Sequence, residues 1–197
     1  MFTPFAIVYS ILLILTSKEK RENFINFLTV FVVSLGLSAI FWLPAILETK
    51  YTVGLQIYDF KRNFPDLFQL IVPSWGSGFF GSFYNEMSVQ IGIANLLAVL
   101  LSFFALFKFI KKKDSKKIIL SFFIISFFVV LFLMQEISIN IWNVVPLMNY
   151  FQFPWRFLSL IILICSFLAA ASTTIFKNKY FSIFLIFFAV LLTFNYA

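Results

Sequence analysis

The sequence contains no histidine, and its single cysteine, Cys165, lies inside an apolar run. An intrachain disulfide requires two cysteines, and zinc sites of the common type combine several cysteine and histidine side chains. Imidazole acid–base chemistry requires a histidine. These three kinds of chemistry are therefore excluded for this chain. The sequence identifies no cofactor and no set of ligands for a divalent metal.

Charged residues are also scarce, at 12% of the chain, whereas soluble domains carry about 25%. Hydrophobic residues make up 62% of the sequence, and the mean hydropathy is +1.00. Such a chain has too little polar surface to cover a water-facing exterior, so we expect lipid to surround it. The net charge of +7 does not indicate nucleic-acid binding, because the positive residues form short clusters between apolar stretches rather than one basic face.

Six apolar stretches approach the roughly 20 residues that one membrane-spanning helix needs. They are residues 2–16, 24–43, 89–107, 118–134, 155–176 and 180–193. We therefore predict an all-α fold, a polytopic transmembrane bundle of about six helices, in a single domain over residues 1–197. Residues 44–88 and 135–154 are predicted as external loops. A short interfacial helix is expected at residues 64–73, which begin and end near prolines.

The basic residues predict the orientation of these helices. Lysine and arginine concentrate in residues 17–23, 108–117 and 177–179, and these connections alternate with connections that hold few basic residues. By the positive-inside rule, the lysine-rich connections face the cytoplasm. Both ends of the chain then lie outside. The short first helix, which no charged residue precedes, leads us to expect a piece of a larger multi-pass protein of the cell membrane.

The tryptophans support the same orientation. Amphipathic rings favour the headgroup level of a bilayer. The sequence places all four at or beyond the predicted outer ends of helices: Trp42, Trp75, Trp142 and Trp155.

Two parts of the first external loop hold candidate ligand-binding residues. Pro44 is expected in the first turn of a new short helix, where its missing N–H leaves no bond unmade. Glu48 then lies one turn later, either as a carboxylate over an outward-facing cavity or, more simply, as a solvated residue at a helix end. Tyr84 and Glu86 follow a glycine-rich turn and are candidates for polar recognition, although a solvated loop end explains them equally well.

The start of the fifth predicted helix carries the most suggestive residues. Arg156 follows Arg62 as the next basic residue in the external connections, and it stands beside Trp155 and two residues after Pro154. Arginine at a membrane boundary can bind an anionic headgroup or a phosphate with its planar fork. Snorkelling to lipid phosphate, without any role in substrate binding, explains the same position. Both interpretations stay open.

Two motifs, residues 41–48 (FWLPAILE) and 151–157 (FQFPWRF), resemble bacterial membrane proteins known as 6-pyruvoyl-tetrahydropterin synthase-related membrane proteins. That family is similar to the YfhO-like proteins and to the GT-C class of membrane glycosyltransferases. The resemblance implies transfer of a sugar from a polyprenyl-phosphate carrier on the outer face of the membrane. It assigns no catalytic residue, because GT-C enzymes place their catalytic acid in the first external loop and no acidic pair here matches it. Substrate-binding roles for Glu48, Trp155 and Arg156 are inferred from the motifs.

Two other functions stay open beside the glycosyltransferase. A lipid or solute transporter usually places ionisable groups near the middle of the membrane, and the predicted helix interiors hold none. The apolar helices agree with a non-catalytic assembly protein, and the long aromatic loop agrees with it less well. The partners expected are membrane lipid and a polyprenyl-phosphate sugar donor, with no nucleic acid.

Overall fold

The structure is a computed structural model that describes residues 2–51, 60–72, 74, 87–111, 116–173 and 179–194. These residues form helices and irregular connections, and no strand occurs among them. The prediction of an all-α fold is therefore confirmed. The chain divides into two compact units, Met1–Asp59 and Phe60–Ala197. The prediction of a single domain stays a prediction, and each unit is described by itself.

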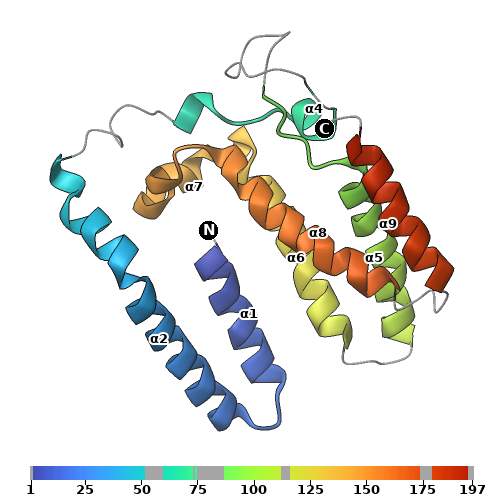
Figure 1. Ribbon diagram of the computed structural model, residues 1–197, viewed down its shortest axis with the longest axis horizontal. Coiled ribbons are helices and arrows are strands. Elements are labelled where there is room, and N and C mark those ends of the chain that lie inside the picture. Colours follow the sequence, from blue (N-terminus) through green and yellow to red (C-terminus); the bar gives the residue numbers. More distant parts are fainter. Residues whose placement is uncertain are drawn as a thin grey trace. The chain divides into compact units, whose positions relative to one another are not determined.

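The first unit is a helical hairpin. Helix α1 (Phe2–Thr16) and helix α2 (Lys20–Leu47) pack against each other and are joined by a three-residue turn (Figure 1). Ser17 closes this turn, because its hydroxyl accepts the backbone N–H of Glu19 at 3.1 Å and the side-chain amide of Asn23 at 2.7 Å. Neither helix contains a buried side chain.

Helix α2 is longer than the predicted 24–43, and the expectation of a new helix at Pro44 is wrong. The helix continues through Pro44 to Leu47, and the short 3-10 turn η1 (Thr49–Tyr51) follows. Proline interrupts a helix because it lacks an N–H and crowds the preceding turn. Here the last turn closes beyond it, since the N–H of Glu48 donates to the carbonyl of Pro44 at 2.8 Å.

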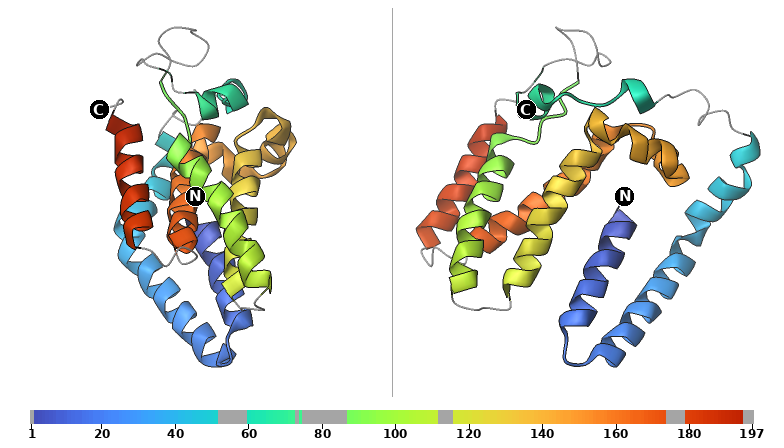
Figure 2. Two further views of the ribbon diagram at one scale, coloured as in Figure 1. Left: turned by 90° about the vertical axis from the view of Figure 1, so that its right-hand side faces the viewer. Right: turned by 180° about the vertical axis from the view of Figure 1, so that it is seen from behind.

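The second unit contains four long helices and a folded-back segment at one of their ends. The helices are α5 (Ile93–Lys111), α6 (Lys116–Leu133), α8 (Leu158–Thr173) and α9 (Lys179–Phe194). Helix α8 packs against α5 and α6, and α9 packs against α5 (Figure 2). The lysines that flank the connection from α5 to α6 gather at one end of this bundle, which we call the lysine-rich end: Lys108, Lys111, Lys116 and Lys117.

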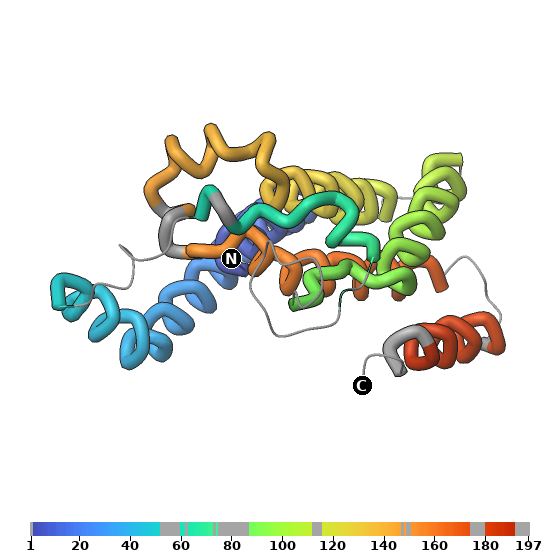
Figure 3. The backbone as a smooth tube through the Cα atoms, turned by 90° about the horizontal axis from the view of Figure 1, so that it is seen from above, coloured from blue at the N-terminus to red at the C-terminus, as the bar shows by residue number. Residues whose placement is uncertain are grey.

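The opposite end is covered by residues 60–72 and 134–157, which we call the cap. Its short elements are η2 (Phe60–Arg62), α4 (Leu67–Ile71), η3 (Glu136–Ser138), α7 (Ile139–Val144), η4 (Pro146–Phe151) and η5 (Pro154–Phe157). Figure 3 shows residues 60–72 running beside the loop that contains α7. A short helix is thus present in the predicted segment 64–73, and its position at a membrane surface stays a prediction.

Helix α4 is fixed at both of its ends. The side-chain oxygen of Gln69 accepts the backbone N–H of Asp66 at 2.8 Å, which is one half of a capping box. Leu70 is fully buried, and its carbonyl accepts the backbone N–H of Ile91 at 2.8 Å. This contact ties α4 to the stretch of chain that leads into α5.

Small side chains allow α5 and α8 to lie close together. Ala98, Ser102 and Ala105 are buried and recur on one face of α5 at the spacing of helix turns. Small residues at such positions let membrane helices approach each other closely. Helix α8 contributes larger buried side chains, among them Ile161, Ile164 and Leu168, which are fully buried. The hydroxyl of Ser102 donates to the carbonyl of Val99 at 2.6 Å, so this polar group is satisfied within its own helix.

Within the described parts of the chain, four helical segments are long and apolar enough to cross a membrane: Lys20–Leu47, Ile93–Lys111, Lys116–Leu133 and Pro154–Thr173. Phe2–Thr16 and Tyr180–Leu191 are apolar but shorter. The outward face of α5 shows the expected lipid-facing character, because Phe104 is 67% exposed and Phe107 is 64% exposed. Soluble proteins rarely expose such contiguous apolar surface. The predicted membrane helices are thus supported for four of the six stretches, and the other two stay predictions.

Enlarging a buried alanine of α5 tests the α5–α8 contact. We expect Ala105→Leu to lower the free energy of unfolding by about 1–3 kcal/mol, because extra methyl groups cannot fit between closely packed helices. The matched control is Ala170→Leu, since Ala170 is exposed on α8. Reversible unfolding in mixed micelles measures both. Equal effects of the two substitutions would show that α5 and α8 are not closely packed.

Candidate functional site

An aromatic cluster around Trp142 holds the cap together. The side chain of Trp142 is fully buried. Its ring stacks on Phe60 with centroids 5.4 Å apart, and it makes edge contacts with Phe64 at 5.7 Å and Phe157 at 5.9 Å. Its indole N–H donates to the carbonyl of Leu133 at 3.0 Å, at the end of α6. Neighbouring aromatic rings enclose Trp142, and its predicted position at the headgroup level stays a prediction.

Polar contacts join the same parts of the cap. The side-chain amide of Gln135 donates to the carbonyl of Pro65 at 3.3 Å, which connects the turn after α6 to the stretch before α4. The hydroxyl of Ser138 donates to the carbonyl of Gln135 at 2.7 Å. These bonds and the aromatic cluster fix α7 and residues 60–66 against the starting point of α8.

Directly before α8, the backbone takes a strained turn at Gln152. Gln152 has a φ of 60°, and among the described residues no other non-glycine residue has a positive φ. The N–H of Phe153 donates to the carbonyl of Phe151 at 2.6 Å, which closes a three-residue γ-turn. The positive-φ form of this turn is rare and strained. Strain of this kind, about 1–3 kcal/mol, tends to occur at functional sites and is maintained by the surrounding structure.

Pro154 fixes the chain on the other side of this turn. Its ring is fully buried and begins η5, the single 3-10 turn that leads into α8. Proline restricts the residue before it to extended conformations. Phe153 has φ −127° and ψ 116°, in agreement with that restriction. Strain at Gln152 and rigidity at Pro154 together set the position of the next two residues, Trp155 and Arg156.

Arg156 and Trp155 both contact the ring of Phe153. The indole of Trp155 stacks on this ring with centroids 5.5 Å apart, and Cζ of Arg156 lies 5.1 Å from the ring centroid. The Nη1 group of Arg156 donates to the carbonyl of Phe151 at 3.2 Å. The carbonyl is thus shared between the γ-turn and the guanidinium. These contacts place a half-buried cation at the start of α8 in a defined orientation.

Most of the hydrogen-bonding capacity of Arg156 remains open. A guanidinium has five N–H donors, and the part of the chain that the structure describes provides one acceptor for this side chain and no carboxylate. The positive end of the α8 dipole lies beside it, which adds to the local positive potential. Both the guanidinium and the positive end of the helix dipole attract an anion. Chemically, the arrangement is therefore suited to binding a phosphate or a carboxylate.

Of the other predicted site residues, the structure brings Trp155 together with Arg156 through the ring of Phe153. Glu48 belongs to the first unit, where it is exposed and follows the last residue of α2. Tyr84 and Glu86 lie outside the described residues. Among the residues that the structure describes, no group of three cysteine, aspartate or glutamate side chains is positioned to hold a metal. The roles proposed for Glu48, Tyr84, Glu86, Trp155 and Arg156 stay predictions.

Sequence reasoning missed the backbone at Gln152 and the carbonyl of Phe151. Both lie within the FQFPWRF motif, and Pro154 was a signal that the chain is restrained there. A positive φ at glutamine has no signature in a single sequence, because glycine and asparagine are the residues that normally mark it.

Substitutions at Gln152 test the strained turn. We expect Gln152→Gly to leave the free energy of unfolding unchanged within about 1 kcal/mol, because relief of strain offsets the flexibility of glycine. Gln152→Val should lower it by about 1–2 kcal/mol, because a β-branched residue tolerates positive φ poorly. Chemical unfolding in micelles compares the two variants. If valine is accepted as well as glycine, the γ-turn does not carry strain.

Comparisons of this chain with protein families, with curated proteins and with solved structures find no match. The resemblance carried by residues 41–48 and 151–157 therefore stays a prediction, and the function is argued from the site itself.

Proposed function

We propose that this chain is the membrane-embedded portion of a multi-pass, GT-C-like glycosyltransferase and that Arg156 binds the phosphate of its polyprenyl-phosphate-linked sugar. The observation that carries the proposal is the half-buried guanidinium of Arg156 at the start of α8, which has one acceptor and no carboxylate partner among the described residues. The resemblance of the surrounding motif to membrane glycosyltransferases supplies the reaction class.

The contacts of Arg156 favour binding of one phosphate group in a defined position over non-specific attraction of counter-ions. Two rigid features, the carbonyl of Phe151 and the ring of Phe153, hold the guanidinium plane in place. A fixed fork can bind two oxygens of one phosphate at once, which a flexible lysine cannot do. Partial burial lowers the effective dielectric around the charge and strengthens each bond that it makes to an anion.

The distribution of basic residues supports an outer-face position for this site. The lysine-rich end lies at the opposite end of α5 and α6 from the cap. The positive-inside rule assigns the lysine-rich end to the cytoplasm. The cap and Arg156 then lie at the outer interface, where the phosphate of a lipid-linked sugar is expected.

In this proposal, Arg156 balances charge rather than moving protons. Departure of the sugar from a polyprenyl-phosphate carrier leaves negative charge on the phosphate, and a fixed cation beside it stabilises that charge. Trp155, stacked on Phe153, offers an apolar surface beside the same phosphate. The catalytic base and the acceptor sugar are not assigned to residues of this chain, and Glu48 stays a candidate for ligand binding.

A non-catalytic assembly role is the second candidate. It is favoured by the α1–α2 hairpin, which has no buried side chain of its own and exposes long apolar surfaces such as that of Leu37, at 77% exposure. Surfaces of this kind contact either lipid or further membrane helices. Co-purification of a fixed membrane partner, without any turnover, would favour assembly over catalysis.

Substitutions of Arg156 test the proposed phosphate site. We expect Arg156→Ala in the full chain, reconstituted in nanodiscs, to weaken binding of polyprenyl phosphate by about 10–100-fold, which corresponds to loss of charge-assisted bonds worth about 1.5–3 kcal/mol. Arg156→Lys should restore only part of the affinity because it lacks the planar fork. Native mass spectrometry of the bound lipid measures both effects.

Arg21→Ala serves as the control, since Arg21 is exposed in the first unit. A parallel titration with phosphatidylglycerol separates a lipid-linked substrate from an ordinary headgroup. Preference for polyprenyl phosphate that disappears with Arg156 supports the proposal. Equal loss for both lipids indicates a general headgroup anchor, and no loss for either rejects Arg156 as a phosphate ligand.

A further inference from the structure

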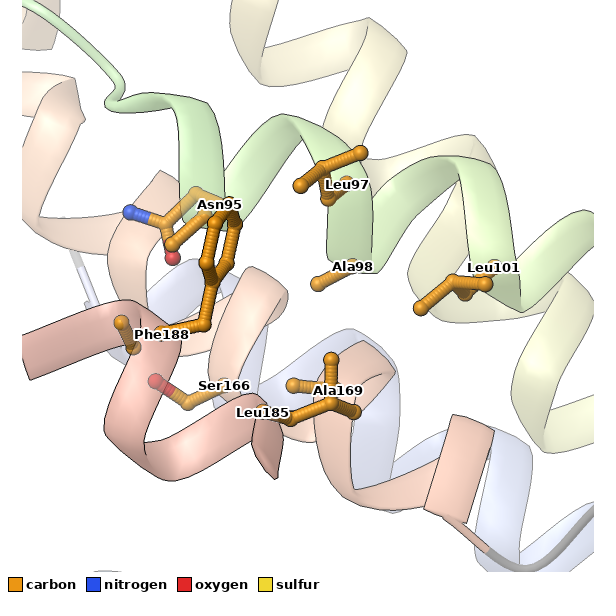
Figure 4. Close-up of a pocket in the computed structure, with 10 residues that line it drawn as sticks. Asn95, Leu97, Ala98, Leu101, Ser166, Ala169, Leu185 and Phe188 are labelled. Atoms are coloured by element: carbon orange, nitrogen blue, oxygen red, sulfur yellow. The ribbon is translucent and has the colours of Figure 1, made fainter. Parts of the chain in front are cut away.

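A pocket of about 220 Å³ lies between α5, α8 and α9, away from the cap residues that surround Arg156. Figure 4 shows Asn95 and Phe188 at one end of this pocket, Ala98 near its middle and Leu101 at the other end. The residues that line it are mostly alanine and leucine: Ala94, Leu97, Ala98, Leu101, Ala169, Leu185 and Ala189, with Asn95, Ser166 and Phe188.

Short side chains on all three helices create this space. Ala94 and Ala98 of α5 face Ala169 of α8 and Ala189 of α9 across the pocket. The chain contains 31 phenylalanines, so large side chains are abundant elsewhere in the sequence. The pocket exists because alanine, rather than phenylalanine, occupies these four positions. Helix α9 therefore packs beside α5 and α8 without filling the space between them.

Water does not suit the pocket. Its volume corresponds to roughly seven waters at about 30 Å³ each, and every buried water needs two to four polar partners. The hydroxyl of Ser166 already donates to the carbonyl of Ile162 at 2.8 Å within α8. Asn95 is the one other side chain with hydrogen-bonding groups in the lining. A pocket with so few polar groups is expected to take up hydrocarbon.

Asn95 is held at the end of the pocket where α5 begins. Its side-chain N–H donates to the carbonyl of Ile91 at 2.6 Å. Gly92 has a φ of +88°, and a Cβ added to it would lie 3.8 Å from the side-chain nitrogen of Asn95, so the turn into α5 lies beside this amide. Within the part of the chain that the structure describes, the second N–H and the oxygen of the amide have no partner. The amide is thus oriented and still able to bind a polar group.

We propose that this pocket binds the part of one phospholipid acyl chain that lies next to the ester, with the second N–H of Asn95 donating to the ester carbonyl of that chain. The lining is apolar, and it belongs to helices whose outward faces are also apolar, with Leu100 57% exposed and Ile186 66% exposed. A phospholipid has its ester groups where the hydrocarbon begins, which matches one amide at the end of an apolar pocket. The inference depends on the membrane assignment of α5 and α8 and is independent of the phosphate site at Arg156.

A photoactivatable phosphatidylglycerol with a diazirine on one acyl chain tests this proposal. The full chain is reconstituted in nanodiscs with the probe, irradiated and digested, and the labelled residues are identified by mass spectrometry. We expect labelling at Leu97, Leu101 or Leu185 to exceed labelling at the lipid-facing Leu100 by at least fivefold. Even labelling of pocket-lining and lipid-facing leucines overturns the proposal.

Two substitutions separate the pocket from the polar contact. Ala94→Phe fills the pocket and should reduce its labelling at least fivefold, whereas Ala170→Phe, on the exposed surface of α8, should leave it unchanged. Asn95→Leu keeps an apolar pocket but should reduce retention of the phospholipid through detergent washing several-fold. Unchanged retention by Asn95→Leu rejects the ester contact.

Thermal unfolding of each variant shows whether it folds. If Ala94→Phe does not fold, Ala189→Leu is used to fill the pocket instead. Preferential labelling by a polyprenyl-phosphate probe of matched chain length, in place of the phospholipid, would overturn the choice of occupant. Cross-links between two copies of the protein at this pocket would also overturn it, because they show that a helix fills the space. If the wild-type pocket is not labelled while polyprenyl phosphate still binds at Arg156, the acyl-chain proposal fails and the proposed function stands.

Discussion

The second unit depends above all on the close approach of α5 and α8. Lipid tails are as apolar as leucine, so helices in a bilayer gain little by hiding apolar side chains and associate through tight packing instead. Ala98, Ser102 and Ala105 are buried small residues on one face of α5, and α8 packs against this helix. Helix α6 packs on the same α8, so the chain between α6 and α8 has to fold back over the end of the bundle as the cap.

The helix contacts combine small side chains of α5 with large ones, since Phe123 of α6 stacks on Phe167 of α8 with centroids 3.7 Å apart. The cap is built from aromatic rings around the buried Trp142. A rigid cap can sustain the strained backbone at Gln152 and hold Arg156 against Phe153. Small residues of α5, α8 and α9 line the gap beside α9, whereas the aromatic cap holds the residues that are proposed to bind phosphate.

Helix positions followed from hydropathy because apolar runs of membrane length have few alternatives to helix. The break expected at Pro44 did not occur, since a proline near a helix end leaves the last turn able to close behind it. Position along the chain does not tell a buried ring from a lipid-facing one, so the burial of Trp142 among other rings was not predicted. Arg156 was identified from its charge in an apolar context. The backbone at Gln152 and the part-buried amide of Asn95 depend on tertiary contacts that a single sequence does not reveal.

The bond from Gln135 to Pro65 also has a consequence for the order of assembly, because 70 residues separate its two partners. At translation rates of about 5–20 residues per second, residues 60–66 are made roughly 4–14 s before the turn that receives them. Phe60 and Phe64 have no docking surface during that interval, since Trp142 is synthesised later still. The nascent chain therefore carries an aromatic segment through several seconds of membrane insertion, and that segment requires protection by an insertase or by lipid until α6 has been delivered.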